Sequence, residues 1–418
     1  MRDPVTPDFG TLRRRASKIR GDLARLLLGQ FLSQIGDWLA YIALPLLVLD
    51  WTGQPILASF SLLFELLPAI LVAPFAGVVA DYYDRRNILI ISDLVRAGLL
   101  VVMVLTNELW LLLAAAFSVG AVSQFFGPAL AAVLPNLVDE RSLLKFNSLR
   151  QSLNTGAMVA GPAVGGIALG LVGARGAFVV DAVSFLISAL LLVTIRMRGL
   201  PTNGVEKFDK SFHSDMLAGF NYLIGQKVAL GAVTIVAATI LGAAALNALE
   251  PVFAREISAN AELAFGMMVT FWGLGMVVGS GLLMRVGHHW SWRRLFLGGS
   301  LLLGVSTMGV ATSVSLATVL AMLAVGGIGN ALTAILLTTI LQRLVPDILR
   351  GRVFAFSTLA IQSAQVLGMM TWGALAQYFP TRSLFAVASL LSLGAFLAGH
   401  ALWPYDIAPT VYKKGVPP

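Results

Sequence analysis

Residues 56–86 read ILASFSLLFELLPAILVAPFAGVVADYYDRR, an apolar run followed by a short charged turn. A helix of about 20 apolar residues crosses the roughly 30 Å hydrocarbon core of a bilayer. Residues 56–80 contain one ionisable side chain, Glu65, and are longer than this minimum. The turn then carries two acidic residues and the pair Arg85-Arg86 before the next apolar run starts. This stretch therefore predicts a membrane span with a charged connection to its neighbour.

The same pattern of an apolar run and a polar break recurs along all 418 residues. The residues AVILMFWYC make up 57% of the chain and charged residues only 12%, against roughly 25% charged in soluble domains. So much apolar surface needs a hydrocarbon environment. We predict an all-α integral membrane protein with twelve transmembrane helices at residues 24–50, 56–80, 88–106, 109–134, 148–173, 177–197, 228–254, 262–284, 295–313, 315–341, 353–377 and 383–404.

The positions of the cationic residues predict the orientation. Of the 29 Lys and Arg residues, all but four fall in breaks or at span ends on the same side as the N-terminus. Arg175, Arg255 and Arg382 fall on the other side, and Arg96 lies within the third run. Because Lys and Arg are retained on the cytoplasmic side, we expect both termini in the cytoplasm. The first run is longer than a signal-peptide core, so we expect residues 1–23 to be a retained cytoplasmic tail.

The longest polar break, residues 198–227, divides the spans into six and six. We predict an N-terminal half at 24–197, a cytoplasmic linker at 198–227, a C-terminal half at 228–404 and a cytoplasmic tail at 405–418. A shift of 206 residues places Pro45 on Pro251 and Asp50 on Glu256, a weak repeat of the right period. Parallel six-helix halves with substrate held between them at midplane are one common transporter symmetry.

Several function classes are excluded by what the sequence lacks. The chain has no Cys, and its four His residues do not form an HExxH motif, so we expect no metal and no cofactor. It also lacks a G-x-x-x-x-G-K-[ST] phosphate-binding loop, which argues against ATP-driven transport by this chain alone. The net charge of +8 lies in short breaks between spans and predicts no nucleic-acid partner. We expect a protein that is not an enzyme.

The charged turn after the second run has the form G-x-x-x-D-x-x-x-R-R. Glycine lets two helices approach closely. An aspartate at the C-terminal end of a helix needs compensation, because the helix dipole disfavours an anion there. The start of the eleventh run supplies candidate cations, so we expect a gating contact in which Asp81 meets Arg352, or else Arg350. A plain charged turn on the cytoplasmic side remains the alternative. The gating candidates are Gly77, Asp81, Arg85, Arg86, Arg350 and Arg352.

These residues resemble motif A of the major facilitator superfamily, whose members share the plan of twelve spans in two halves. Gly161-Pro162-Ala163-Val164-Gly165-Gly166 in the fifth run is similar to the G-P-x-x-G-G motif of the superfamily's antiporters. The candidate packing residues are Gly161, Pro162, Gly165 and Gly166, and ordinary packing of small residues is an equal explanation. The wider pattern resembles the branch that holds macrolide-efflux and enterobactin-exporter proteins. Residues 111–134 contain no Arg, so proton coupling through the motif B arginine is not implied.

Polar side chains inside the spans are costly and are candidates for function. Asp37 shares one helical face with Gln30, Gln34 and Tyr41, and a second such face lies in the eleventh run. We expect these faces to line a substrate cavity; hydrogen bonds between helices are the other interpretation of the amides. Burial disfavours an ionised carboxyl group, so we expect Asp37 to carry the coupling proton, with Glu65 or Glu250 second. The cavity candidates are Gln30, Gln34, Asp37, Tyr41, Glu65, Asn247, Glu250, Gln362, Gln365, Met369 and Trp372.

Asp93 and Arg96 are three residues apart, and we expect them to form an internal ion pair. Together these features predict a secondary transporter of the cytoplasmic membrane, monomeric, with a small-molecule substrate, protons and the lipid bilayer as its partners. The resemblance implies export of an amphipathic or lipophilic compound, drug-like, macrolide-like or a siderophore, by alternating access in exchange for protons. A lipid or lysolipid flippase of the same fold is the alternative.

Overall fold

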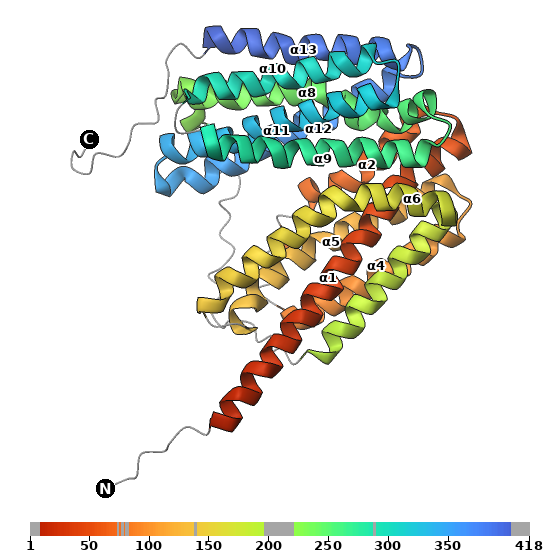
Figure 1. Cartoon of the computed structure of the whole chain (residues 1–418), viewed down its shortest axis with the longest axis vertical. Helices are drawn as coiled ribbons and strands as arrows, with labels where there is room; N and C mark the ends of the chain where they lie inside the picture. Colours follow the sequence, from red (N-terminus) through yellow and green to blue (C-terminus); the bar gives the residue numbers. More distant parts are fainter. Residues whose placement is uncertain are drawn as a thin grey trace, which may run out of the picture. The chain divides into compact units, whose positions relative to one another are not determined.

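The computed structural model describes residues 9–72, 75–76, 79, 83–137, 140–195, 221–286 and 290–402. In these ranges the regular structure is entirely helical (Figure 1). The helices are α1 (Phe9–Thr52), α2 (Pro55–Leu71), α4 (Arg85–Leu105), α5 (Leu109–Leu137), α6 (Glu140–Thr194), α8 (Lys227–Ile257), α9 (Ala261–Val286), α10 (Trp292–Thr312), α11 (Leu316–Leu344), α12 (Asp347–Leu375) and α13 (Thr381–Leu402).

Ten helices in the described ranges are long and apolar enough to cross a membrane, and α2 is a shorter apolar helix of 17 residues. One of the ten, Leu153–Thr194, is 42 residues long and contains most of two predicted spans, 148–173 and 177–197. Its backbone leaves the helical conformation at Gly173, where φ is 69° and ψ is 171°. A positive φ of this size favours glycine, so Gly173 marks the bend between those two spans. The all-helical membrane architecture is confirmed, whereas twelve spans and cytoplasmic termini stay predictions.

The chain divides into two compact units. The first contains residues 1–43 and 64–206, and the second contains residues 44–63 and 207–418. Helix α1 passes from one unit to the other between Ala43 and Leu44, next to Pro45 within the helix. Proline removes a backbone hydrogen bond and favours a kink, so the sequence weakens α1 where it changes unit. The predicted six-helix halves and the linker at 198–227 stay predictions.

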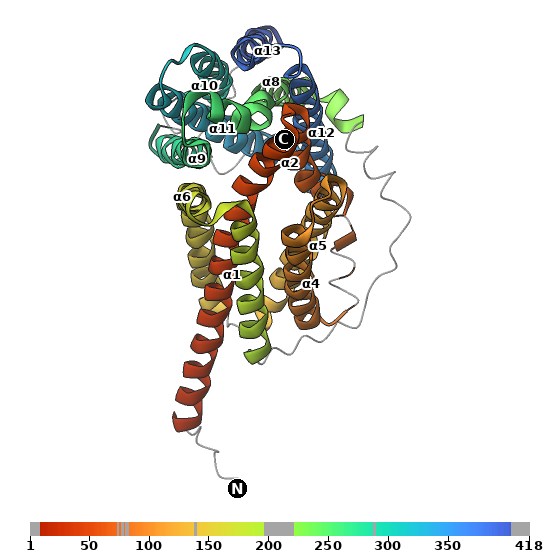
Figure 2. The same cartoon turned by 90° about the vertical axis from the view of Figure 1, so that its right-hand side faces the viewer.

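Within the first unit, α4 packs against α5 and α6. Within the second, α8 packs against α12 and α13, α10 against α11 and α13, and α9 against α11 (Figure 2). The contact between α9 and α11 is close because both helices place glycine there. A Cβ atom on Gly275 would lie 2.1 Å from the Ala324 carbonyl oxygen, and one on Gly327 would lie 2.1 Å from that of Trp272. Small residues at such points allow backbone contact between membrane helices.

The three arginines that the predicted topology assigns to the outer side each have a fixed partner. Arg175 donates to the Asn107 side chain, and Arg255 pairs with Asp50. Arg382 donates to the carbonyl oxygens of Ala311, at 3.2 Å, and Ser313, where α10 ends. Cations at a helix C-terminus are favoured by the helix dipole. These exceptions to the positive-inside pattern are therefore explained by local hydrogen bonding and charge pairing.

Candidate functional site

The candidate site lies in the first unit, where α1 touches α6 at Gly36. A Cβ atom on Gly36 would lie 2.3 Å from Asp181 Oδ1 and 3.0 Å from Asp181 Cα. Only glycine fits at that position without moving α6, so the sequence brings the middle of α1 directly against Asp181. Asp37, the next residue on α1, is exposed, whereas Asp181 is only 1% exposed. An accessible and an enclosed carboxyl group thus lie on facing helices.

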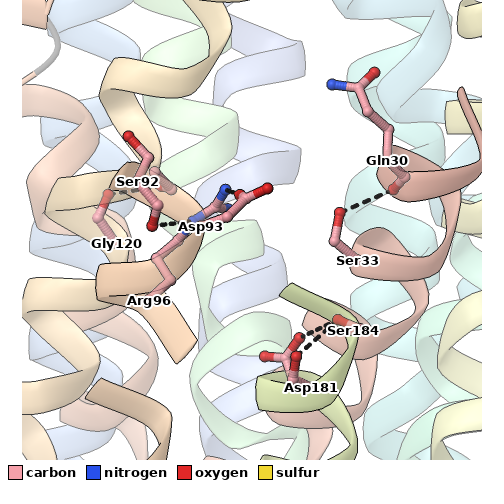
Figure 3. A network of polar contacts seen from close by, with 9 residues as sticks. Gln30, Ser33, Ser92, Asp93, Arg96, Gly120, Asp181 and Ser184 are labelled. Carbon is pink, nitrogen blue, oxygen red and sulfur yellow. Dashed lines mark hydrogen bonds and ion pairs between the residues drawn. The ribbon is translucent and has the colours of Figure 1, made fainter. Parts of the chain in front are cut away.

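Asp181 can accept a hydrogen bond from a hydroxyl group but has no cationic partner among the described residues. Ser184 Oγ lies 2.7 Å from the Asp181 carbonyl oxygen and 3.3 Å from Asp181 Oδ1, and can donate to either (Figure 3). In the part of the chain that the structure describes, Asp181 forms no ion pair with Lys, Arg or His. A buried carboxylate without a cation or several hydrogen bonds is costly, whereas the neutral acid is much less so.

Arg96 is the cation of the site. It forms an ion pair with Asp93 one helical turn away on α4, and its Nε donates to the Ser92 carbonyl oxygen at 3.3 Å (Figure 3). The predicted internal ion pair is therefore confirmed. Both side chains are buried, and the Arg96 guanidinium lies 4.0 Å from the ring centroid of Phe185. The aromatic face stabilises a cation that is removed from water.

The charges of four carboxyl groups and Arg96 act on one another in this cluster. Asp37 interacts electrostatically with Arg96 and Asp93, and Asp181 with Asp37, Arg96 and Glu65. Glu65 lies on α2, is half-buried, and its Oε2 atom has no hydrogen-bond partner among the described residues. We name these five residues, Asp37, Glu65, Asp93, Arg96 and Asp181, the acidic cluster. Since Arg96 balances one acid, full ionisation would leave three negative charges without a cation, on the exposed Asp37, the half-buried Glu65 and the buried Asp181.

Asp181 was missed by sequence reasoning although its signal is present. It is an aspartate in the apolar run 177–197, and the rule that selected Asp37 applies equally to it.

The polar face predicted on α1 is only partly available to a substrate. Gln34 donates through Nε2 to Asn154 Oδ1 of α6 at 2.7 Å, and the Tyr41 ring meets Trp38 edge-on at 5.5 Å. The Gln30 carbonyl oxygen accepts from Ser33 (Figure 3).

The remaining predicted cavity residues lie in the second unit. Gln362 and Gln365 of α12 and Asn247 of α8 are half-buried. Glu250 is 8% exposed and forms no hydrogen bond or ion pair within the described ranges. Met369 and Trp372 are buried, and the Trp372 indole N–H donates to the Leu241 carbonyl oxygen at 2.9 Å. Trp372 is thus fixed in the contact between α12 and α8.

Some of the predicted gating residues lie outside the part of the chain that the structure describes. Gly77 and Asp81, and the side chain of Arg350, lie outside the described residues, and Arg352 is half-buried. Arg86 donates to the Val193 carbonyl oxygen of α6 at 2.7 Å, and Arg85 is buried.

In the packing motif, Cβ atoms on Gly161 and Gly165 would lie 2.3 Å from Trp38 Cδ1 and 3.3 Å from Trp38 O. Pro162 and Gly166 are buried beside them. The motif therefore packs against α1 at Trp38, the residue that follows Asp37.

Long apolar helices with charged side chains buried among them define a polytopic membrane protein. The chain belongs to the transmembrane secretion effector family of the major facilitator superfamily, because the family model of that description matches residues 19–406. The resemblance seen in the sequence motifs is thereby confirmed.

Curated relatives support the same assignment. An uncharacterised transporter of this superfamily from Bacillus subtilis, YfiS, is 26% identical over 88% of this chain and 90% of its own length. The multidrug efflux pump Tap of Mycolicibacterium fortuitum is 25% identical over 89% and 93%, respectively. Macrolide efflux protein A of Streptococcus pyogenes is 25% identical over 69% and 71%. Among solved structures, a POT family transporter in complex with 5-aminolevulinic acid has a TM-score of 0.73 at 13% identity, covering 91% of this chain and 96% of that one.

Proposed function

We propose that this protein exports a small amphipathic or lipophilic compound across the cytoplasmic membrane by alternating access, in exchange for protons. It acts as a monomer in this proposal. The cargo is a bulky, partly apolar, neutral or cationic molecule of the macrolide or drug class, with a siderophore as the second candidate. The efflux functions in the names of Tap and macrolide efflux protein A support the direction and the cargo class.

The observation that carries the proposal is the imbalance of the acidic cluster, four carboxyl groups and one guanidinium. An uncompensated charge on an enclosed member such as Asp181 costs several kcal/mol in a low-dielectric interior, and a bound proton removes that cost. Asp37 is exposed and can exchange protons, whereas Asp181 is enclosed and faces Gly36 at its side. In this proposal Asp37 is the principal proton site, with Glu65 or Glu250 secondary. A cationic cargo and a proton then compete for the same negative charge.

The efflux test uses a drug-sensitive bacterium whose own efflux systems are deleted. Expression should lower the accumulation of at least one lipophilic drug in a broad panel, macrolides included, and a protonophore should restore that accumulation. A protonophore distinguishes export driven by protons from other causes of low accumulation, because it removes the proton gradient without touching the protein. The proposal fails if no compound shows reduced accumulation while vesicles containing the protein instead take up a sugar or flip a lysolipid.

The cytoplasmic gate is a separate part of the proposal. Asp81 meets Arg352, or else Arg350, when the transporter is open outward. Two charges about 4 Å apart near a protein surface attract by about 4 kcal/mol before desolvation, enough to bias a conformational equilibrium. Because the chain has no Cys, one engineered cysteine at the cytoplasmic end of each of the second and eleventh spans gives an unambiguous cross-link. Asp81→Asn should reduce this cross-linking and favour the inward-open state.

Asp84→Asn is the matched control for the gate. Asp84 accepts the Asn87 backbone N–H at 3.0 Å and caps α4, and asparagine caps a helix equally well. Cross-linking in this variant should therefore equal that of the parent. Unchanged cross-linking and transport in Asp81→Asn would remove the gate from the proposal.

A further inference from the structure

A pocket of about 210 Å³ lies within the second unit between α8, α11 and α12. α8 packs against α12 while α11 packs against α9 and α10, so α11 and α12 are held by different neighbours and touch little. The floor is buried and includes Thr333, Ser357 and Leu341, whereas Ala334, Thr338 and Thr358 are exposed at the mouth. The lining residues are Val236, Ile240, Asn330, Thr333, Ala334, Leu337, Thr338, Leu341, Phe354, Ser357, Thr358 and Ile361.

No ionisable side chain lines this pocket. An ion in such a place would lose its hydration without gaining a counter-charge, which is costly. The acidic cluster of the first unit has the opposite character. The pocket therefore selects an uncharged group, or the uncharged part of a larger molecule, by its apolar walls.

Three of the four hydroxyl groups that line the pocket donate to backbone carbonyl oxygens and so offer acceptor lone pairs to a ligand. Thr333 donates its hydroxyl proton to the Gly329 carbonyl oxygen at 3.1 Å, Thr338 to that of Ala334 at 3.0 Å, and Ser357 to that of Val353 at 2.8 Å. A hydroxyl group that donates in this way keeps its acceptor lone pairs. The Asn330 amide nitrogen faces the Met276 sulfur at 3.8 Å, and its amide oxygen accepts no hydrogen bond from the described residues. A ligand that supplies O–H or N–H donors matches this arrangement.

The volume limits how much of a ligand the pocket holds. Sites for drug-sized molecules are roughly 300–1,000 Å³, so about 210 Å³ accommodates one ring system and not a whole macrolide. We propose that this pocket binds an uncharged apolar ring that carries a hydroxyl or N–H donor, as a subsite for one part of the cargo. The inference rests on the proposed export function for its biological role but is testable by binding alone.

The test measures binding of two probes of one size, 1-naphthol and 1-methoxynaphthalene, to the full chain in lipid nanodiscs by saturation-transfer NMR, with empty nanodiscs subtracted. Only 1-naphthol has a donor. We expect it to bind the parent about tenfold more tightly, as one well-made hydrogen bond allows. Replacing two acceptors in Thr338→Val/Ser357→Ala should reduce that preference to about twofold while leaving 1-methoxynaphthalene binding unchanged.

A variant that fills the pocket with a larger side chain tests where the probes bind. Ala334→Trp places a large ring in the mouth and should weaken both probes by tenfold or more. Ile335→Trp is the matched control, because Ile335 is the next residue on α11, is exposed and does not line the pocket. It should bind both probes as the parent does.

Equal affinity of the parent for the two probes, an unchanged preference in the double variant, or normal binding to Ala334→Trp would each overturn the pocket assignment. The export proposal has a separate readout in the accumulation assay. Drug efflux with any of these binding results leaves export standing and rejects the pocket. Specific 1-naphthol binding to a protein that exports no compound and instead takes up a sugar or flips a lysolipid leaves the pocket standing and rejects export.

Discussion

Replacing Asp37 with asparagine should abolish uphill export driven by a pH gradient and leave substrate binding or equilibrium exchange partly intact. Asparagine has nearly the shape of aspartic acid but cannot carry a proton, so the variant mimics a permanently neutral site. Coupling needs a group that exchanges protons during the cycle, whereas exchange of substrate for substrate does not. The measurement compares gradient-driven accumulation with counterflow in proteoliposomes that contain the same amount of protein.

Asp22→Asn is the matched control for Asp37, because Asp22 lies on the same helix, pairs with Arg25 at 3.2 Å and is outside the acidic cluster. It should retain gradient-driven transport. If Asp37→Asn accumulates substrate as well as the parent, the assignment of the coupling proton to Asp37 is wrong. Glu65→Gln and Asp181→Asn then identify which remaining carboxyl group carries it.

Replacing Arg96 with methionine should destabilise the first unit strongly. Methionine keeps much of the length and the apolar contact with Phe185, but it leaves the buried Asp93 carboxylate without its cation. Breaking a buried ion pair by removing one partner costs about 3–5 kcal/mol in soluble proteins. We expect a marked fall in the thermal unfolding temperature of the purified protein and a lower yield of monodisperse protein.

The double variant Asp93→Asn/Arg96→Met provides the control for this effect. It removes the unpaired charge as well as the cation, so it should recover a large part of the lost stability, since replacing both partners of a buried pair is often nearly neutral. Equal stability of Arg96→Met and the parent would show that this ion pair contributes little. A double variant that is no more stable than Arg96→Met would show that the aromatic contacts of Arg96, and not the pairing, are what matters.

Much of the fold could be predicted from residue types and spacing alone. The apolar runs predict membrane helices because hydrocarbon leaves the backbone no other hydrogen-bond partner than itself. The Asp93–Arg96 pair could be predicted because residues three apart on a helix share a face. The polar face of α12 is a weaker guide to the substrate cavity than these two patterns are to the fold. Helix α8 covers Trp372 and supplies the acceptor for its indole N–H. Periodicity identifies a face of a helix but not the helix that packs on it.

The sequence by itself determined the membrane class, the family and the polar candidates within the spans, since each depends on local composition or on a short motif. Only the tertiary structure brought Asp181 of α6 against Gly36 of α1, beside Asp37, with Arg96 of α4 as the cluster's cation. It also created the uncharged pocket between α8, α11 and α12. The reason is that the energy of a buried charge or of an empty space depends on which neighbours surround it. Many of those neighbours are distant along the chain, as Asp181 is from Gly36, and lie beyond the reach of any local pattern.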